Sequence, residues 1–249
     1  MKNKDFIIIA HRGESYDAPE NTLASISLAW ERNADAVEID IQLTRDKKIV
    51  VIHDKSTLRT GGKFKRIATS IYNELLQINV GKFKGAKWKN EKIPLLNEVI
   101  DTIPDNRILF IELKSNADII NPLKKLISDK KAKSDQIKFI GFDYKTMSLT
   151  KKLLPKFESY WIIEGKNYKR ASNFNAAITK CRKSKLDGID VQERKYLNEK
   201  VINSAHNSNL KIYTWTVDDP NRAKQLRLAG IDGITTNRAK WLKQQLMIF

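Results

Sequence analysis

Short apolar runs alternate along the chain with longer stretches in which apolar residues recur every three or four positions. The short runs predict buried β-strands, and the longer stretches predict amphipathic helices that pack on them. Apart from one hairpin return, the predicted strands are Phe6–Ala10, Ala36–Gln42, Arg107–Glu112, Ile137–Phe142, Ser159–Ile163, Leu186–Val191, Lys211–Val217 and Ile231–Thr235. The predicted helices that follow them cover residues 21–32, 95–103, 118–130, 145–153, 171–184, 197–208, 220–228 and 238–246.

This alternation runs without a break in composition and favours one (β/α)8 barrel that spans residues 1–249. A doubly wound sheet usually has a glycine-rich first turn, and the loop HRGESYDAPE after the first strand lacks GxGxxG. Residues 55–94 show no clear period and contain Gly61, Gly62, Gly81 and Gly85. We expect them to form an insertion with one short helix near Ile71–Gln77.

The stretch from Glu38 to Asp54 predicts a strand, a polar turn and a returning strand over Ile49–His53. Because residues i and i+2 of a strand point to the same face, the side chains of Glu38 and Asp40 should project together. If the chain folds back at the turn, His53 lies roughly opposite one of these two carboxylates. Taken alone, the segment is also compatible with a plain hairpin that has solvated carboxylates and a surface histidine.

Candidate catalytic residues gather where the predicted strands end, which is where (β/α)8 barrels place their active sites. The ionisable and polar residues at these ends are His11, Arg12, Glu38, Asp40, Glu112, Lys114, Asp143, Glu164, Gln192, Glu193, Trp215, Thr235 and Thr236. The carboxylates of Glu38, Asp40 and Glu112, without a cysteine or imidazole cluster, suit one hard divalent cation, Ca²⁺ or Mg²⁺, rather than zinc.

Two of the three histidines, His11 and His53, fall at the same predicted rim, whereas His206 lies in a helix and suits a surface role. Arg12 and Lys114 provide donors for a phosphate, as a planar fork and a point charge. Together these residues suit metal-assisted phosphodiester chemistry. One histidine would accept a proton from the nucleophile, and the other would protonate the leaving alkoxide.

The chain has 46 lysines and arginines against 29 acidic residues, a net charge of +17, which favours anionic partners in general. We find no arginine-rich tail or basic-aromatic run, so a solvated ring of outer helices is favoured over a dedicated nucleic-acid surface. The single cysteine, Cys181, excludes an internal disulfide framework. No run reaches the ~18 apolar residues of a membrane span, and without a secretory signal we expect a cytoplasmic protein.

Seven short motifs occur in order along nearly the whole chain: AHRG from Ala10, APENTL from Ala18, EID from Glu38, VVIHD from Val50, ELK from Glu112, WTVD from Trp215 and GITTNR from Gly233. In this set the sequence resembles the glycerophosphodiester phosphodiesterases. The resemblance implies a barrel of the phospholipase-C-like phosphodiesterase type that hydrolyses deacylated phospholipids to glycerol 3-phosphate and an alcohol. It also implies that Glu38, Asp40 and Glu112 bind the metal.

The same resemblance implies that His11 and His53 are the general acid/base pair and that Arg12 and Lys114 face the phosphate. Glu20 should lie near the site and orient it. Trp215 and Phe142 are candidates for the alcohol side of the pocket, with a plain core role for each equally open. This chain departs from the family in having Gly141 for a frequent Ser and Asn237 for a frequent Asp. We expect neither change to touch the metal, the acid or the base.

Two alternatives stay open from the sequence. In the first, a substrate hydroxyl takes the place of water, so that a cyclic phosphate is released by a related lyase-like reaction. In the second, the chain is a non-catalytic basic barrel that binds anionic membrane or nucleic acid. The preferred alcohol, the choice between Ca²⁺ and Mg²⁺ and the oligomeric state are likewise open.

Overall fold

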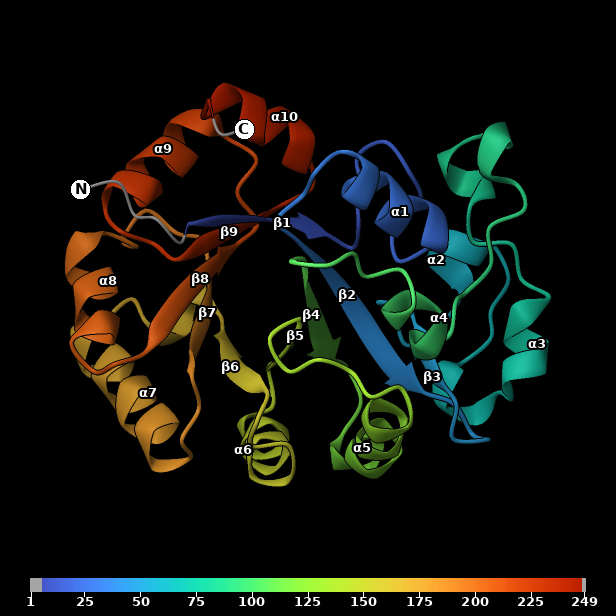
Figure 1. The fold of residues 1–249 in the computed structure, drawn as a ribbon, viewed down its shortest axis with the longest axis horizontal. Coiled ribbons are helices and arrows are strands. Elements are labelled where there is room, and N and C mark those ends of the chain that lie inside the picture. Colours follow the sequence, from blue (N-terminus) through green and yellow to red (C-terminus); the bar gives the residue numbers. More distant parts are fainter. Residues whose placement is uncertain (1–5, 248–249) are drawn as a thin grey trace.

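The computed structural model describes residues 6–247, and its main feature is a closed barrel of parallel strands (Figure 1). The barrel strands are β1 (Ile7–His11), β2 (Ala36–Leu43), β4 (Ile108–Leu113), β5 (Ile137–Gly141), β6 (Glu158–Ile163), β7 (Gly188–Gln192), β8 (Lys211–Trp215) and β9 (Gly233–Thr236). Each pairs in parallel with the next, and β1 pairs with both β2 and β9, which closes the ring. The predicted (β/α)8 barrel is confirmed.

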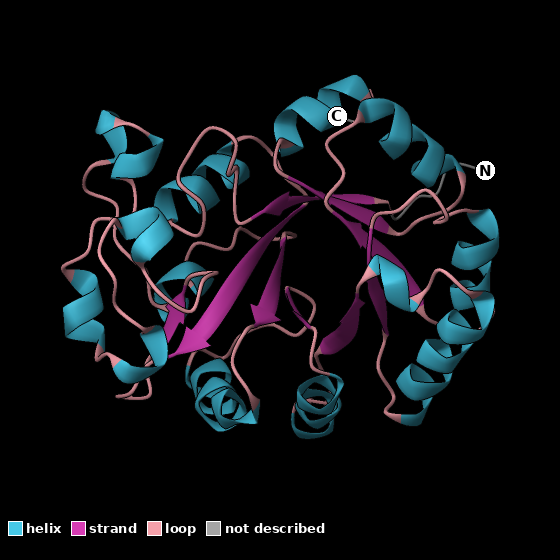
Figure 2. Cartoon of the chain, turned by 180° about the vertical axis from the view of Figure 1, so that it is seen from behind, coloured by secondary structure: helices cyan, strands magenta, loops and turns pink. Residues whose placement is uncertain are grey.

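Helices cover the outside of this barrel, as the views from the two sides show (Figures 1 and 2). They are α1 (Leu23–Glu31), α4 (Leu96–Ile100), α5 (Ile120–Asp129), α6 (Tyr144–Leu153), α7 (Ala171–Lys183), α8 (Glu199–His206), α9 (Pro220–Leu228) and α10 (Ala239–Gln245), with the 3-10 turns η4 (Ala117–Ile119) and η5 (Gly165–Asn167). Polar side chains begin several of them. Thr22 accepts a hydrogen bond from the Ser25 amide, and Asp143 and Asn198 cap α6 and α8 in the same way.

One apolar cluster consists of strand residues alone, so it fills the inside of the barrel; among its members are Ile9, Ala36, Phe110, Tyr160 and Tyr213. Side chains of a strand alternate between its two faces. The inward-facing row therefore continues two residues beyond each of these positions. The next inward positions are His11 after Ile9, Glu38 after Ala36, Glu112 after Phe110 and Trp215 after Tyr213.

The hairpin predicted after the second strand is present. The first half of β2 pairs with β1, and its second half pairs with the antiparallel strand β3 (Ile49–Val51). The return strand ends earlier than predicted, although the Ile52 amide still donates to the Asp40 carbonyl at 2.9 Å. His53 lies two residues beyond the last residue of β3, so the pairing of this ladder does not extend to it.

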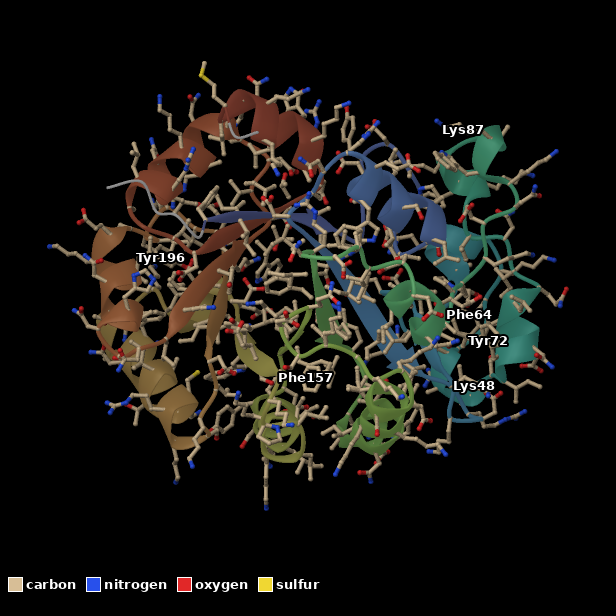
Figure 3. The ribbon with its side chains drawn as sticks, viewed as in Figure 1. Lys48, Phe64, Tyr72, Lys87, Phe157 and Tyr196 are labelled. Atoms are coloured by element: carbon tan, nitrogen blue, oxygen red, sulfur yellow. The ribbon has the colours of Figure 1, made fainter. Side chains whose placement is uncertain are left out.

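The inserted segment, residues 55–94, has more structure than the single short helix that we expected. It contains α2 (Leu58–Gly61), η1 (Ile67–Thr69), α3 (Tyr72–Leu76), η2 (Lys82–Lys84) and η3 (Ala86–Trp88). It lies beside the barrel beyond β3, where Figure 3 labels Phe64 and Tyr72. A small core of its own, including Ile67, Leu75 and Ile78, packs against Val50 and Ile52. The predicted short helix is present as α3, and the other short helical turns were missed because the glycines that end them, such as Gly61 and Gly62 of α2, were interpreted as loop residues.

Between residues 6 and 247, none of the helices has the length and apolar character that crossing a bilayer requires.

Candidate active site

The carboxyl ends of β1, β2 and β4 bring the predicted site residues together. In the register of the barrel, His11 is the neighbour of Glu38, and Asp40 is the neighbour of Glu112. A cavity of about 360 Å³ opens at this edge and is lined by His11, Arg12, Glu38, His53, Glu112, Lys114, Ile140, Phe142, Ile162, Asp190, Trp215, Thr216 and Thr235. Asp40 is buried beside it, and Glu20 reaches it through an ion pair with Arg12.

Three other carboxylates that we placed at strand ends have partners elsewhere. Asp143 accepts from the Thr146 amide as the cap of α6, Glu164 pairs with Lys166, and Glu193 pairs with Arg222. They therefore do not belong to the acidic cluster.

The acidic cluster consists of Glu38, Asp40 and Glu112, each of which offers a carboxylate oxygen within 4.8 Å of the other two. Lys114 Nζ lies 3.2 Å from Asp40 Oδ1 and 2.7 Å from Glu112 Oε1. Arg12 Nε lies 3.2 Å from Asp40 Oδ2. All three carboxylates are buried, so their mutual repulsion is strong.

The electrostatics of the cluster follow from this crowding. Burial, together with the charge of Asp40, raises the pKa of Glu38 well above its usual range and that of Glu112 to about 7. Burial opposes ionisation of Asp40 too, but Lys114 and Arg12 hold its pKa below the usual value. Asn21 also orients Asp40, because its Nδ2 donates to Oδ2 at 2.8 Å and its Oδ1 accepts from the Asp40 amide. An arrangement of oxygen donors with excess negative charge fits a hard divalent cation.

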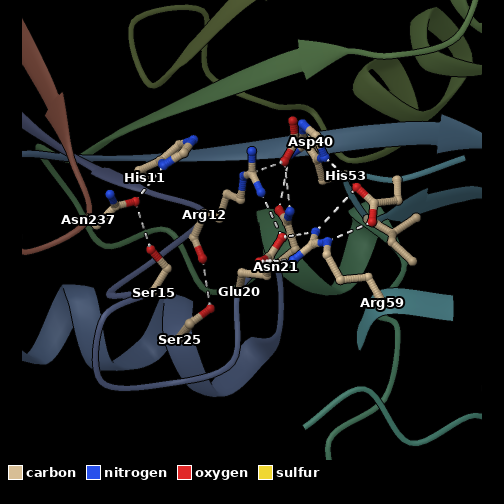
Figure 4. A network of polar contacts seen from close by, with 12 residues as sticks. His11, Arg12, Ser15, Glu20, Asn21, Ser25, Asp40, His53, Arg59 and Asn237 are labelled. Atoms are coloured by element: carbon tan, nitrogen blue, oxygen red, sulfur yellow. Dashed lines mark hydrogen bonds and ion pairs between the residues drawn. The ribbon is translucent and has the colours of Figure 1, made fainter. Parts of the chain in front are cut away.

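His11 is fixed by a hydrogen bond that the sequence analysis did not anticipate. Its Nδ1 lies 2.7 Å from Asn237 Oδ1 (Figure 4). The Asn237 side-chain amide donates to Asp218 Oδ2 at 2.8 Å, which turns the amide oxygen toward the ring. This oxygen only accepts, so Nδ1 of His11 carries the proton and Nε2 is left as an acceptor. Asn237, which we expected to touch neither acid nor base, thus contacts one of the two candidate histidines.

Burial, with the neighbouring Arg12 charge, lowers the pKa of His11 to about 4. The imidazole is consequently neutral at pH 7. Its Nε2 lies 4.0 Å from Glu38 Oε2, so the accepting nitrogen points to the acidic cluster.

His53 is held from the other side by a row of alternating charges (Figure 4). Its Nδ1 lies 2.7 Å from Asp54 Oδ1, and Arg59 Nε donates to Asp54 Oδ2 at 2.7 Å. Arg59 also donates to both oxygens of Glu20, at 2.7 and 2.8 Å, and Glu20 accepts from Arg12 at 2.8 Å. The loops that carry the two histidines are thus joined through Glu20, Arg59 and Asp54.

Asp190 of β7 was not among the predicted site residues, but its buried side chain lines the cavity. Within residues 6–247 its Oδ1 has no hydrogen-bond partner. Burial, with the charge of Glu112, raises its pKa well above the usual range. Asp190 lies two residues after Gly188, in the inward-facing row, and this alternation was the signal that could have identified it.

A closed parallel barrel with an acidic cluster and two imidazoles at the carboxyl ends of its strands is typical of (β/α)8 enzymes. The chain belongs to the glycerophosphoryl diester phosphodiesterase family, whose model matches residues 11–240. The resemblance noted in the sequence is confirmed, and the chain is an enzyme of the glycerophosphodiester phosphodiesterase type.

Individual relatives agree with the family. YhdW of Bacillus subtilis is 32% identical over 233 residues, which cover 92% of this chain and 93% of YhdW. The glycerophosphodiester phosphodiesterase of Caldanaerobacter subterraneus is 29% identical over 237 residues, which cover 93% of this chain and 93% of that protein. An Oleispira antarctica phosphodiesterase, solved in complex with the product sn-glycerol-3-phosphate, superposes with a TM-score of 0.88 at 25% identity over 97% of this chain and 96% of its own.

Proposed function

We propose that this chain hydrolyses glycerophosphodiesters to sn-glycerol 3-phosphate and an alcohol, with one divalent cation, Ca²⁺ or Mg²⁺, and two catalytic histidines. The observation that carries the proposal is a single cavity. His11 and His53 line it together with Glu38 and Glu112. The small volume of this cavity, about 360 Å³, suits a small-molecule diester.

Glu38, Asp40 and Glu112 would hold the cation, since their oxygens converge within 4.8 Å and repel one another. The raised pKa values of Glu38 and Glu112 support this assignment, because a bound cation offsets that repulsion. When bound, a divalent cation supplies Lewis-acid stabilisation of the phosphoryl oxygens and of a nucleophilic water.

His11 suits the role of proton acceptor. It is neutral at pH 7, and Asn237 holds the tautomer in which Nε2 accepts. His53 would then protonate the leaving alkoxide. Asp54 occupies Nδ1 of that ring, so Nε2 remains for the substrate.

Arg12 and Lys114 would bind the phosphate, since both side chains line the cavity. In the structure they pair with Asp40, which keeps both groups pre-oriented at the site. Glu20 orients Arg12 through their 2.8 Å ion pair. The rings of Trp215 and Phe142, which also line the cavity, pack edge to face at 5.6 Å and offer an apolar surface to the alcohol side of the substrate.

The test is hydrolysis of glycerophosphocholine by purified protein supplied with Mg²⁺ or Ca²⁺ and, in parallel, treated with EDTA. We expect sn-glycerol 3-phosphate with metal and none with EDTA, and phosphorus NMR of the products separates hydrolysis from release of a cyclic phosphate. His11→Ala and His53→Ala should each abolish turnover. His206→Ala is the matched control, because His206 pairs with Asp232, away from the cavity. A chain without turnover on any glycerophosphodiester would contradict the proposal.

A further inference from the structure

The inserted segment contains two copies of the tripeptide Lys-Phe-Lys, at Lys63–Lys65 and Lys82–Lys84. Residues 55–92 contain ten lysines and arginines against two glutamates, so the segment accounts for a large part of the net charge of +17. The chain therefore does contain basic-aromatic runs, contrary to what we expected from its overall composition. The solvated outer helices of the barrel do not explain this charge, because it is concentrated in the inserted segment around aromatic residues.

Both phenylalanines leave much of the ring in water. Phe64 is 64% exposed and Phe83 is 48% exposed, and Leu58 in the same segment is 54% exposed. One exposed apolar side chain is normal on a protein surface, but several in one basic segment indicate an interaction surface.

Two of these three residues, Leu58 and Phe83, lie on neighbouring elements. The turn η2, which contains Phe83, packs beside α2, which begins at Leu58. The Lys-Phe-Lys loop at 63–65 follows directly after α2. It folds back on Thr57, whose amide donates to the Lys65 carbonyl at 3.0 Å, while the Lys65 amide donates to Thr57 Oγ1 at 3.1 Å.

The same residues border the active-site edge of the barrel. Thr57 comes three residues after Asp54, the partner of His53. Lys84 reaches the loop that follows His11, where its Nζ donates to the Ser15 carbonyl at 2.7 Å. Each Lys-Phe-Lys copy thus contacts a loop segment that follows one of the two histidines in the chain.

We propose that the inserted segment docks on an anionic phospholipid bilayer. Phe64, Phe83 and Leu58 enter the headgroup region, and Lys63, Lys65 and Lys82 contact the lipid phosphates. Lysine stems can lie along the apolar boundary while their ammonium groups reach the phosphates. The aliphatic Leu58 favours a bilayer over nucleic acid, since it offers no ring for stacking on bases. The proposal goes beyond hydrolysis and does not depend on it.

The experiment is sedimentation of the whole chain with vesicles of equal parts phosphatidylcholine and phosphatidylglycerol, and with vesicles of phosphatidylcholine alone. We expect binding to the anionic vesicles only. The variant Lys63→Gln/Lys65→Gln/Lys82→Gln should bind about a hundredfold more weakly, because each lysine near such a surface contributes about a factor of five or more. Phe64→Ser/Phe83→Ser should bind about tenfold more weakly at unchanged charge.

Matched controls lie on the opposite flank of the barrel, on α7, α8 and α9 (Figure 1). Lys183→Gln/Lys200→Gln/Lys224→Gln removes the same charge from exposed helix positions, and Leu228→Ser removes a leucine that is 80% exposed. We expect both controls to bind like the original chain.

Three outcomes would overturn the docking proposal. The control variants lose as much vesicle binding as the docking variants, the original chain binds neutral vesicles as well as anionic ones, or it binds neither kind of vesicle. A different pattern would also overturn it: the original chain binds a duplex oligonucleotide but not vesicles, and the Lys63/Lys65/Lys82 variant no longer binds the oligonucleotide. Hydrolysis of soluble glycerophosphocholine, measured on the same samples, reports separately on the proposed function. Docking variants that keep full hydrolysis but lose vesicle binding are the expected result.

Discussion

Replacing Asn237 by leucine removes the hydrogen bond that sets the tautomer of His11 while keeping a side chain of similar size. In the protein, Asn237 Oδ1 lies 2.7 Å from His11 Nδ1, and this hydrogen bond is partly buried. A buried N–H left without an acceptor costs about 1–3 kcal/mol, so the ring would favour the tautomer that carries its proton on Nε2. At about 1.4 kcal/mol for each factor of ten, kcat should fall about 5- to 150-fold.

Steady-state hydrolysis of glycerophosphocholine at pH 7 measures this effect, and we expect KM to change little because His11 is not assigned to binding. Asn237→Asp is the informative companion, because a carboxylate beside His11 favours the charged ring and raises its pKa by about 1–2 units. The imidazole is then protonated at higher pH, so the acidic limb of the kcat/KM profile should move upward from a pKa of about 4. A kcat within twofold of the original in the leucine variant would refute the assigned tautomer.

Three further outcomes follow from the site. Glu112→Gln should weaken binding of Mg²⁺ or Ca²⁺ by at least about tenfold in calorimetric titration. In the original chain affinity should rise between pH 6 and pH 8, because protons compete with the ion near the Glu112 pKa of about 7. Asp54→Asn should lower kcat by about 10- to 150-fold with KM unchanged, since a charge-assisted hydrogen bond of about 1.5–3 kcal/mol orients His53; an unaltered kcat would sink that role. Asp190→Asn should raise the melting temperature of metal-free protein at pH 8 but not near pH 4. The raised pKa of Asp190 means that stability is lost as pH rises above its unfolded value of about 4, and equal melting curves at pH 8 would contradict this.

Local sequence patterns were enough to predict the barrel and the strand ends of the site. Apolar runs marked the strands to within two residues at most ends, and the motif at Glu38 and Asp40 placed both side chains on one face. His11, far from them in sequence, could be added because the carboxyl ends of parallel strands share one edge of a barrel.

Contacts made by residues distant in sequence could not be predicted in this way. Asn237 reaches His11 across 226 positions, and Arg59 reaches Glu20 from within the insertion. The register that produces these contacts depends on barrel closure and on the path of the inserted segment. Asp190 is different, because the alternation of its strand was visible but a single acid between apolar residues was not interpreted as inward-facing.

The proposed function requires that three carboxylates hold a divalent cation between two imidazoles. A crystal structure of the protein with Mn²⁺ and sn-glycerol 3-phosphate tests it directly, because the anomalous signal of manganese locates the ion. We predict a peak bonded to oxygens of Glu38, Asp40 and Glu112, with the rings of His11 and His53 on either side of the phosphate. A peak away from these carboxylates, or a phosphate that contacts neither ring, would contradict the account.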